Sequence, residues 1–162
     1  MILHDVVALA AGLAEGTRLL GLDVGEKTVG LAISDRGLAV ASPLETLKRG
    51  KLAADVAALQ ALCEDRKVGG LVIGLPVNMD GSEGPRCQST RQFAVNLAER
   101  GLGLPSAFWD ERLSTAAVER LLIDEADLSR KRRGQVVDKM AAAYILQGAL
   151  DALASHRQRR GT

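Results

Sequence analysis

The sequence predicts an α/β fold, built on a mixed five-stranded sheet with helices on both faces. Three short apolar runs near the start of the chain are separated only by brief turns, which favours antiparallel hairpin pairing. Two later apolar runs each follow a segment with helical spacing, as in parallel sheets whose strands are joined by crossover helices. Right-handed crossovers place the fourth and fifth strands beside the first. The expected strand order is therefore 3-2-1-4-5, with strand 2 antiparallel.

Each element has its own local signal. Gly25 marks the turn after the first strand, and residues 69–75 (GGLVIGL) form the continuous apolar run typical of a buried parallel strand. Pro85 suits the first turn of a helix, where its missing N–H costs little. The expected strands are residues 18–23, 28–35, 38–47, 69–75 and 104–109. The expected helices are residues 51–66, 85–100, 114–123 and 135–155, the last preceded by a charged connection at 124–134.

The length and composition indicate a single folded domain. A chain of 162 residues with 47% hydrophobic and 25% charged residues is typical of one globular unit. We expect a domain at residues 18–155, an N-terminal extension at 1–17 that forms an amphipathic helix, and a basic C-terminal tail at 156–162 that frays. No run approaches the ~20 apolar residues of a membrane span. Residues 1–16 lack the cationic start of a signal peptide, and Cys63 and Cys87 have no CxxC spacing, so we expect a cytoplasmic protein with reduced thiols.

The net charge of +1 conceals two segregated parts. Residues 129–162 carry 8 Lys/Arg and 2 Asp/Glu, while the rest of the chain is acidic on balance. A basic segment of this kind suits contact with a polyanion such as nucleic acid. The few aromatic side chains argue against a stacking platform for single strands; they are Phe93, Phe108, Trp109 and Tyr144.

Three acidic residues are expected to converge. Asp23 ends the first strand and Glu111, preceded by Asp110, ends the fifth, so their carboxylates lie at the sheet edge where ligands of α/β proteins bind. Asp138 heads a stripe of mostly small apolar residues on the last helix, and such a stripe lets that helix lie close to the sheet. Each acid also has a simpler explanation: turn chemistry for Asp23, surface charge for Asp110 and Glu111, and helix capping for Asp138.

The chemistry of these acids favours a hard metal ion. Neighbouring residues of a strand point to opposite sides, so only one of Asp110 and Glu111 faces the site; Glu111, with its longer reach, is favoured and Asp110 stays an alternative. Three carboxylates repel each other unless a cation is present, and oxygen ligands without His or Cys suit Mg²⁺ or Mn²⁺. Such metals stabilise the attacking and leaving oxygens in phosphodiester hydrolysis.

Polar and basic side chains near these acids are candidates for substrate binding. A run of basic residues precedes Asp138 by a few positions, a long loop at 75–86 leaves the fourth strand, and one arginine directly follows Glu111. Phosphate neutralisation is the functional interpretation, and solvated surface charge is the alternative. The candidates are Asn78, Arg86, Arg112, Lys131, Arg132 and Arg133.

Four segments resemble the YqgF (RuvX-like) family: RLLGLDVGEKTVGLAISD, VIGLPVNMDGSEGPR, FWDERLST and RKRRGQVVDKMAAAYILQGALD. The resemblance spans about residues 18–153. Members are described as pre-16S rRNA nucleases and, earlier, as Holliday junction resolvases. The resemblance implies an RNase H-like fold and catalytic, metal-binding acids at Asp23, Glu111 and Asp138. Thr28 departs from the family pattern, which often has a more basic residue there, so one phosphate contact is expected to be weaker.

The leading hypothesis is a metal-dependent endonuclease that acts on structured nucleic acid, in 5′ maturation of pre-16S rRNA during ribosome biogenesis. Alternatives are a Holliday junction resolvase, an actin-like or sugar-kinase-like phosphotransferase, and a non-catalytic module that binds RNA or ribosomal particles. The phosphotransferase shares the Asp-x-Gly hairpin, but a single domain has no room for its second copy. A resolvase that cuts two strands symmetrically needs a dimer. The sequence leaves monomer and homodimer open.

Overall fold

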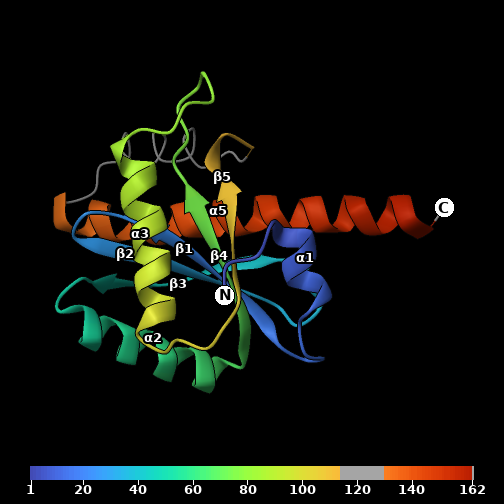
Figure 1. The fold of residues 1–162 in the computed structure, drawn as a ribbon, viewed down its shortest axis with the longest axis horizontal. Helices are drawn as coiled ribbons and strands as arrows, with labels where there is room; N and C mark the ends of the chain where they lie inside the picture. The colour runs from blue at the N-terminus through green and yellow to red at the C-terminus, as the bar shows by residue number, and fades with distance from the viewer. Residues whose placement is uncertain (114–129, 162) are drawn as a thin grey trace.

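The sheet has the order and directions that the sequence predicts. The computed structural model describes residues 1–113 and 130–161, except for the side chains of 130–137 and 161. The strand order is β3-β2-β1-β4-β5 (Figure 1). Strand β2 is antiparallel to both β1 and β3, whereas β1, β4 and β5 are parallel. The strands are β1 Arg18–Val24, β2 Thr28–Ser34, β3 Ala41–Lys48, β4 Val68–Leu75 and β5 Ser106–Asp110. The predicted α/β class and strand order are confirmed.

Helices α2 (Leu52–Arg66) and α3 (Pro85–Glu99) cover one face of the sheet (Figure 1). Alternate strand residues point to this face and pack with the helices into one apolar core. Leu22 and Ile73 from the sheet and Phe93 from α3 are each at most 2% exposed. This core fixes α3, whose first turn lies next to the loop at the carboxyl end of β4.

Helices α1 (Val6–Ala11) and α5 (Arg130–Gly161) cover the opposite face, hereafter the α5 face. The sheet is lined there by small residues, and a methyl group built on Gly21 would lie 2.8 Å from Leu146 Cβ of α5. Ala142 and Ala149 are fully buried against the strands. The alanine stripe therefore brings α5 close to the sheet, as the sequence predicts.

The last helix is longer than expected at both ends. It begins at Arg130, within the segment expected to be a charged connection, and continues through the basic residues expected to fray. Arginine and glutamine are good helix formers, so nothing local stops the helix after Ser155. The helix expected at 114–123 lies outside the described residues.

The N-terminal segment is built into the α5 face. The carboxylate of Asp5 caps α1 by accepting a hydrogen bond from Ala8 N–H at 2.9 Å, and Leu9 is fully buried. Before the helix, Leu3 N–H donates to Ser106 O at 2.7 Å, and Ser106 N–H donates to Met1 O at 2.9 Å. The first residues thus pair with the start of β5. Within the described ranges, no helix has the length and apolar character needed to cross a membrane.

Candidate active site

Asp23 is the first of the three candidate acids, and its side chain is buried. Asp23 pairs with Gly30 across β1 and β2, one residue before β1 ends. Its neighbours Leu22 and Val24 belong to the core under α2 and α3, so strand alternation places Asp23 on the α5 face. With 5% exposure it is the one buried acidic residue in the described part of the chain. Burial holds this carboxylate in a fixed position.

Asp138 lies directly above this strand pair. A methyl group on Gly30 would overlap the backbone carbonyl of Asp138, so α5 touches β2 at the residue that pairs with Asp23. The carboxylate of Asp138 accepts a hydrogen bond from the hydroxyl of Thr28 at 2.5 Å. Strand β2 therefore fixes both the backbone and the side chain of Asp138.

Glu111 reaches the same face from the far side of β4. Strand β5 ends at Asp110, and Glu111 begins the short 3₁₀ helix Glu111–Leu113. A methyl group on Gly74 would lie 3.1 Å from Glu111 Oε1 and 2.5 Å from Ile145 Cδ1 of α5. The absence of a side chain on Gly74 therefore leaves room for Glu111 between the sheet and α5.

Asp110 has a different partner. It accepts hydrogen bonds from the backbone N–H and the guanidinium of Arg112, the shortest being 2.6 Å. These hydrogen bonds, foremost the one from the guanidinium, hold the pKa of Asp110 below its usual value. The geometry thus favours Glu111 over Asp110 as the third acid of the site.

The three acids share a face and an edge, but they do not form a closed cluster. Among the described residues, no three His, Cys, Asp or Glu side chains are grouped so that they could hold a metal ion. The donor types are all carboxylate oxygens and fit Mg²⁺ or Mn²⁺. Because like charges repel, carboxylates on one face stay apart unless a cation draws them together.

The expected substrate-binding residues differ in their surroundings. Arg112 is paired with Asp110, as just described, and also donates to Met79 O at 3.4 Å. Asn78 donates to Ser82 Oγ at 3.1 Å and so stabilises the loop after β4. Arg86 is exposed in the first turn of α3. The backbone of residues 131–133 lies in the first turns of α5, and the side chains of Lys131, Arg132 and Arg133 are outside the described part.

Thr28 has a role that sequence reasoning missed. Its sequence position suggested only a weakened phosphate contact, whereas the structure makes it a hydrogen-bond donor to Asp138. Strand alternation offered a signal, because Thr28, Gly30 and Ala32 lie on one side of β2, and Ala32 faces α5. The partner on α5 could not be found in this way, since 110 positions separate the two residues.

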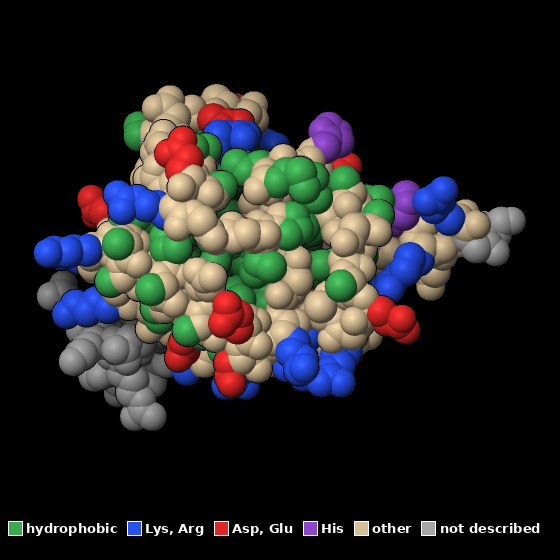
Figure 2. Space-filling view, turned by 60° about the horizontal axis from the view of Figure 1, so that its bottom comes forward, with side chains coloured by type: hydrophobic (Ala, Val, Ile, Leu, Met, Phe, Trp, Pro, Cys, Tyr) green, Lys and Arg blue, Asp and Glu red, His purple; other side chains and the backbone are tan. Residues whose placement is uncertain are grey.

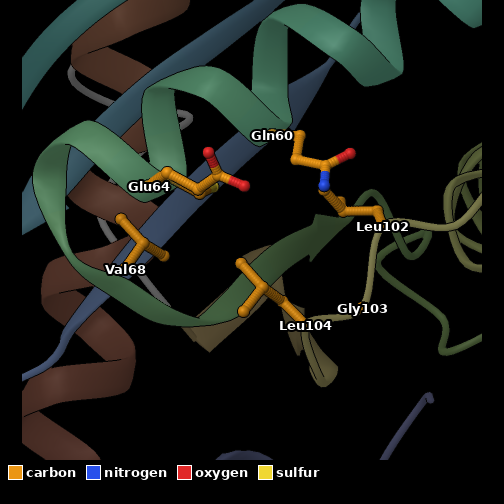
Figure 3. Close-up of a pocket in the computed structure, with 7 residues that line it drawn as sticks. Gln60, Glu64, Val68, Leu102, Gly103 and Leu104 are labelled. Carbon is orange, nitrogen blue, oxygen red and sulfur yellow. The ribbon is translucent and has the colours of Figure 1, made fainter.

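A cavity of about 230 Å³ between α2 and the start of β5 lies away from the acids (Figure 3). Gln60 and Glu64 of α2 lie on one side of it and Leu102 and Leu104 on the other, near where β4 and β5 begin. Burial, with a smaller contribution from Glu64, raises the pKa of the lining thiol of Cys63 to about 11. The protonated thiol is a poor nucleophile. This cavity is at the opposite edge of the sheet from the acids.

The surface on the side of α2 does not resemble a nucleic-acid footprint. Figure 2 shows apolar side chains gathered in the middle of this view, with Lys, Arg, Asp and Glu interspersed around them. A nucleic-acid interface has clustered positive charge instead. The edge that carries Asp23 and Glu111 is therefore the better candidate for the functional surface.

The sheet order and strand directions are those of the RNase H-like fold. RuvC of Thermus thermophilus, solved in complex with a Holliday junction substrate, has the same fold, with a TM-score of 0.50. The two sequences are 14% identical, and the match covers 84% of this chain and 94% of that one. The chain belongs to the RuvX family, described as Holliday junction resolvase, whose profile matches residues 17–152. The resemblance seen in the sequence is thereby confirmed.

Relatives of high identity share one name. A protein of Roseobacter denitrificans is 59% identical over 154 residues, covering 94% of each chain, and is named "Putative pre-16S rRNA nuclease". Two further relatives carry the same name. A protein of Paramagnetospirillum magneticum is 61% identical over 143 residues, which cover 88% of this chain and 91% of that one. A protein of Rhodospirillum centenum is 57% identical over 157 residues, which cover 94% of this chain and 83% of that one. These relationships favour a nuclease over the phosphotransferase alternative.

Proposed function

We propose that this protein is a divalent-metal-dependent endonuclease that cuts phosphodiester bonds in structured nucleic acid, and that its substrate is precursor 16S rRNA. The observation that carries the proposal is the meeting of Asp138 with the β1–β2 pair that holds Asp23. Glu111 adds a third carboxylate on the same face. The name shared by relatives at 57–61% identity supports the choice of substrate.

In this proposal Asp23, Glu111 and Asp138 hold Mg²⁺ or Mn²⁺. Bound metal supplies Lewis-acid stabilisation of the attacking and leaving oxygens. The protein contributes the positions of the ligands. Burial fixes Asp23, Gly74 leaves space for Glu111, and Thr28 orients the carboxylate of Asp138.

Basic residues bind the backbone of the substrate. The backbone of Lys131, Arg132 and Arg133 precedes Asp138 by one to two turns of α5, and in this proposal these residues supply positive charge for phosphates of the substrate. Asn78 and Arg86 extend this contact on the side of α3, and Arg112 does so once a phosphate competes with Asp110. In this proposal the protein acts in the cytoplasm and contacts ribosomal particles, because its substrate is precursor rRNA.

A second candidate function is resolution of Holliday junctions. The description of the family and the fold shared with RuvC favour it. A resolvase must cut two strands symmetrically and so needs two copies of the site. Precursor rRNA cleavage needs only one.

A cleavage assay separates the two candidates. Purified protein is incubated with an end-labelled precursor 16S rRNA fragment, or with a four-way DNA junction, in Mg²⁺, in Mn²⁺ or in EDTA. We expect cleavage of the rRNA in either metal and none in EDTA. Paired cuts in the junction alone would favour the resolvase, and cleavage of neither substrate would contradict the enzyme and favour a binding module.

Thr28→Val is expected to lower kcat about tenfold with KM unchanged. A hydrogen bond to a carboxylate contributes on the order of 1.5–3 kcal/mol, and here it orients the carboxylate of Asp138. Thr28→Ser keeps the hydroxyl and should restore the rate. Steady-state cleavage kinetics would contradict this role if Thr28→Val matched the wild type, or if the serine variant were equally impaired.

A further inference from the structure

A second cavity opens at the carboxyl end of β1, on the side of α3. Its volume is about 320 Å³. Three elements far apart in the sequence form it: the turn after Asp23, the end of β3 and the first turn of α3. The lining residues are Val24, Gly25, Glu26, Arg49, Pro85, Arg86 and Ser89.

Arg49 is held in a defined position at this cavity. Its Nη1 donates to Gly25 O at 2.7 Å, and its guanidinium lies 4.9 Å from the centroid of the Phe93 ring. Its backbone N–H donates to Lys27 O at 2.8 Å. A guanidinium has five N–H donors, so several stay available after the bond to Gly25. Arg49 is thus held in place by Gly25 and Phe93 while keeping guanidinium N–H groups that an acceptor on a ligand can use.

Two arginines and one glutamate line the cavity, so its net charge is positive. Neither Arg49 nor Arg86 belongs to any ion pair in the described part of the chain. The cavity also borders the N-terminus of α3, where Gly84 provides no side-chain cap. The 15 residues of α3 add a partial positive charge at that end. Glu26 is the one acidic residue in the lining, and it is exposed.

We propose that this cavity binds a backbone phosphate of the nucleic-acid substrate. This phosphate is next to the one that is cleaved at Asp23, Glu111 and Asp138, so the inference rests on the function proposed above. Val24 follows Asp23 directly, and successive strand residues point to opposite faces. The acid and the cavity therefore lie on the two sides of one strand end. A nucleic-acid backbone that crosses this edge of the sheet therefore contacts both Asp23 and the cavity. Arg49 and Arg86 are the phosphate-binding residues.

Binding without metal tests this site independently of cleavage. The probe is a fluorescein-labelled helix of precursor 16S rRNA, titrated with protein in EDTA at several KCl concentrations and followed by fluorescence anisotropy. We expect Arg49→Met and Arg86→Ala each to weaken binding about tenfold. The slope of log Kd against log salt should fall by about one in each variant, because one phosphate contact is lost. Glu26→Gln should tighten binding, because it removes the acid from the cavity.

The matched control is Arg66→Ala. Arg66 ends α2, pairs with Asp65 at 3.6 Å and is half exposed, so its loss removes the same charge elsewhere. Arg86 is exposed and takes part in no ion pair among the described residues, so Arg86→Ala keeps the test valid even if Arg49→Met is less stable. Equal effects in Arg66→Ala and the cavity variants, or no effect in either cavity variant, would overturn the site. A wild type that binds through these arginines but cuts no substrate would instead overturn the proposed function and leave the site standing.

Discussion

Asp23→Asn and Asp138→Asn are each expected to lower the rate of cleavage by at least about a hundredfold. Asparagine keeps the shape of aspartate but removes the negative charge, and a metal ion that stabilises the transition state supplies several kcal/mol. Asp23 is buried in a close-packed region, so a substitution that conserves volume should leave the fold intact. The loss should therefore appear in the chemical step and not in the melting temperature.

Single-turnover cleavage of precursor 16S rRNA, with Mn²⁺ binding followed by calorimetry, would measure this loss. Asp151→Asn is the control, because Asp151 lies on α5 like Asp138 but is exposed. It accepts a hydrogen bond from the side chain of Gln147 at 3.0 Å. This variant should cut at the wild-type rate. Full cleavage by Asp23→Asn or Asp138→Asn would remove these residues from the catalytic centre.

Gly30→Ala is expected to impair stability and cleavage together. The added methyl group would overlap the backbone carbonyl of Asp138, and a backbone cannot rotate away as a side chain can. Helix α5 must then shift off the sheet, and overpacking of this kind lowers the free energy of unfolding by about 1–3 kcal/mol. In a domain of this size each kcal/mol lowers Tm by roughly 2–4 °C. Asp138 would move with the helix, so the cleavage rate should also fall.

Gly103→Ala serves as the comparison for Gly30→Ala. Apart from its chain neighbours, no heavy atom of the described residues lies within 4 Å of a methyl group built on Gly103, so Gly103→Ala should change neither Tm nor cleavage. Thermal melts and cleavage rates of both variants would decide the matter. A Gly30→Ala protein that melts and cuts like the wild type would show that α5 need not lie against β2 at this point.

The sheet could be predicted because its signals are local. Brief turns between residues 18 and 47 require hairpins, and helical segments before β4 and β5 require crossovers, so the strand order follows from connection rules. Asp23 could be found for the same reason, because it stands at the end of an apolar run. Glu111 was harder to distinguish from Asp110, because β5 ends between them and strand alternation no longer applies after Asp110.

The rest depends on contacts between distant segments. No sequence pattern indicates that Thr28 donates a hydrogen bond to Asp138. The same holds for the contacts of Arg49 with Gly25 and Phe93. The ends of α5 were misjudged for a related reason. Charged residues around Gly134 and after Ser155 suggested irregular chain, whereas the apolar middle of the helix, packed on the sheet, provides a nucleus from which both ends extend.

The pairing of residues 1 and 3 with Ser106 also bears on how copies of this protein can associate. An outer strand of a sheet presents unpaired N–H and C=O groups, which can recruit a strand from another molecule. At Ser106 both groups are already bonded to the chain's own N-terminus. The other outer strand, β3, contains Pro43, which has no N–H to donate, and bears the charged side chains of Glu45 and Lys48. The start of β5 and the outer side of β3 are therefore poor templates for strand addition, which favours association through side chains of the helices and loops.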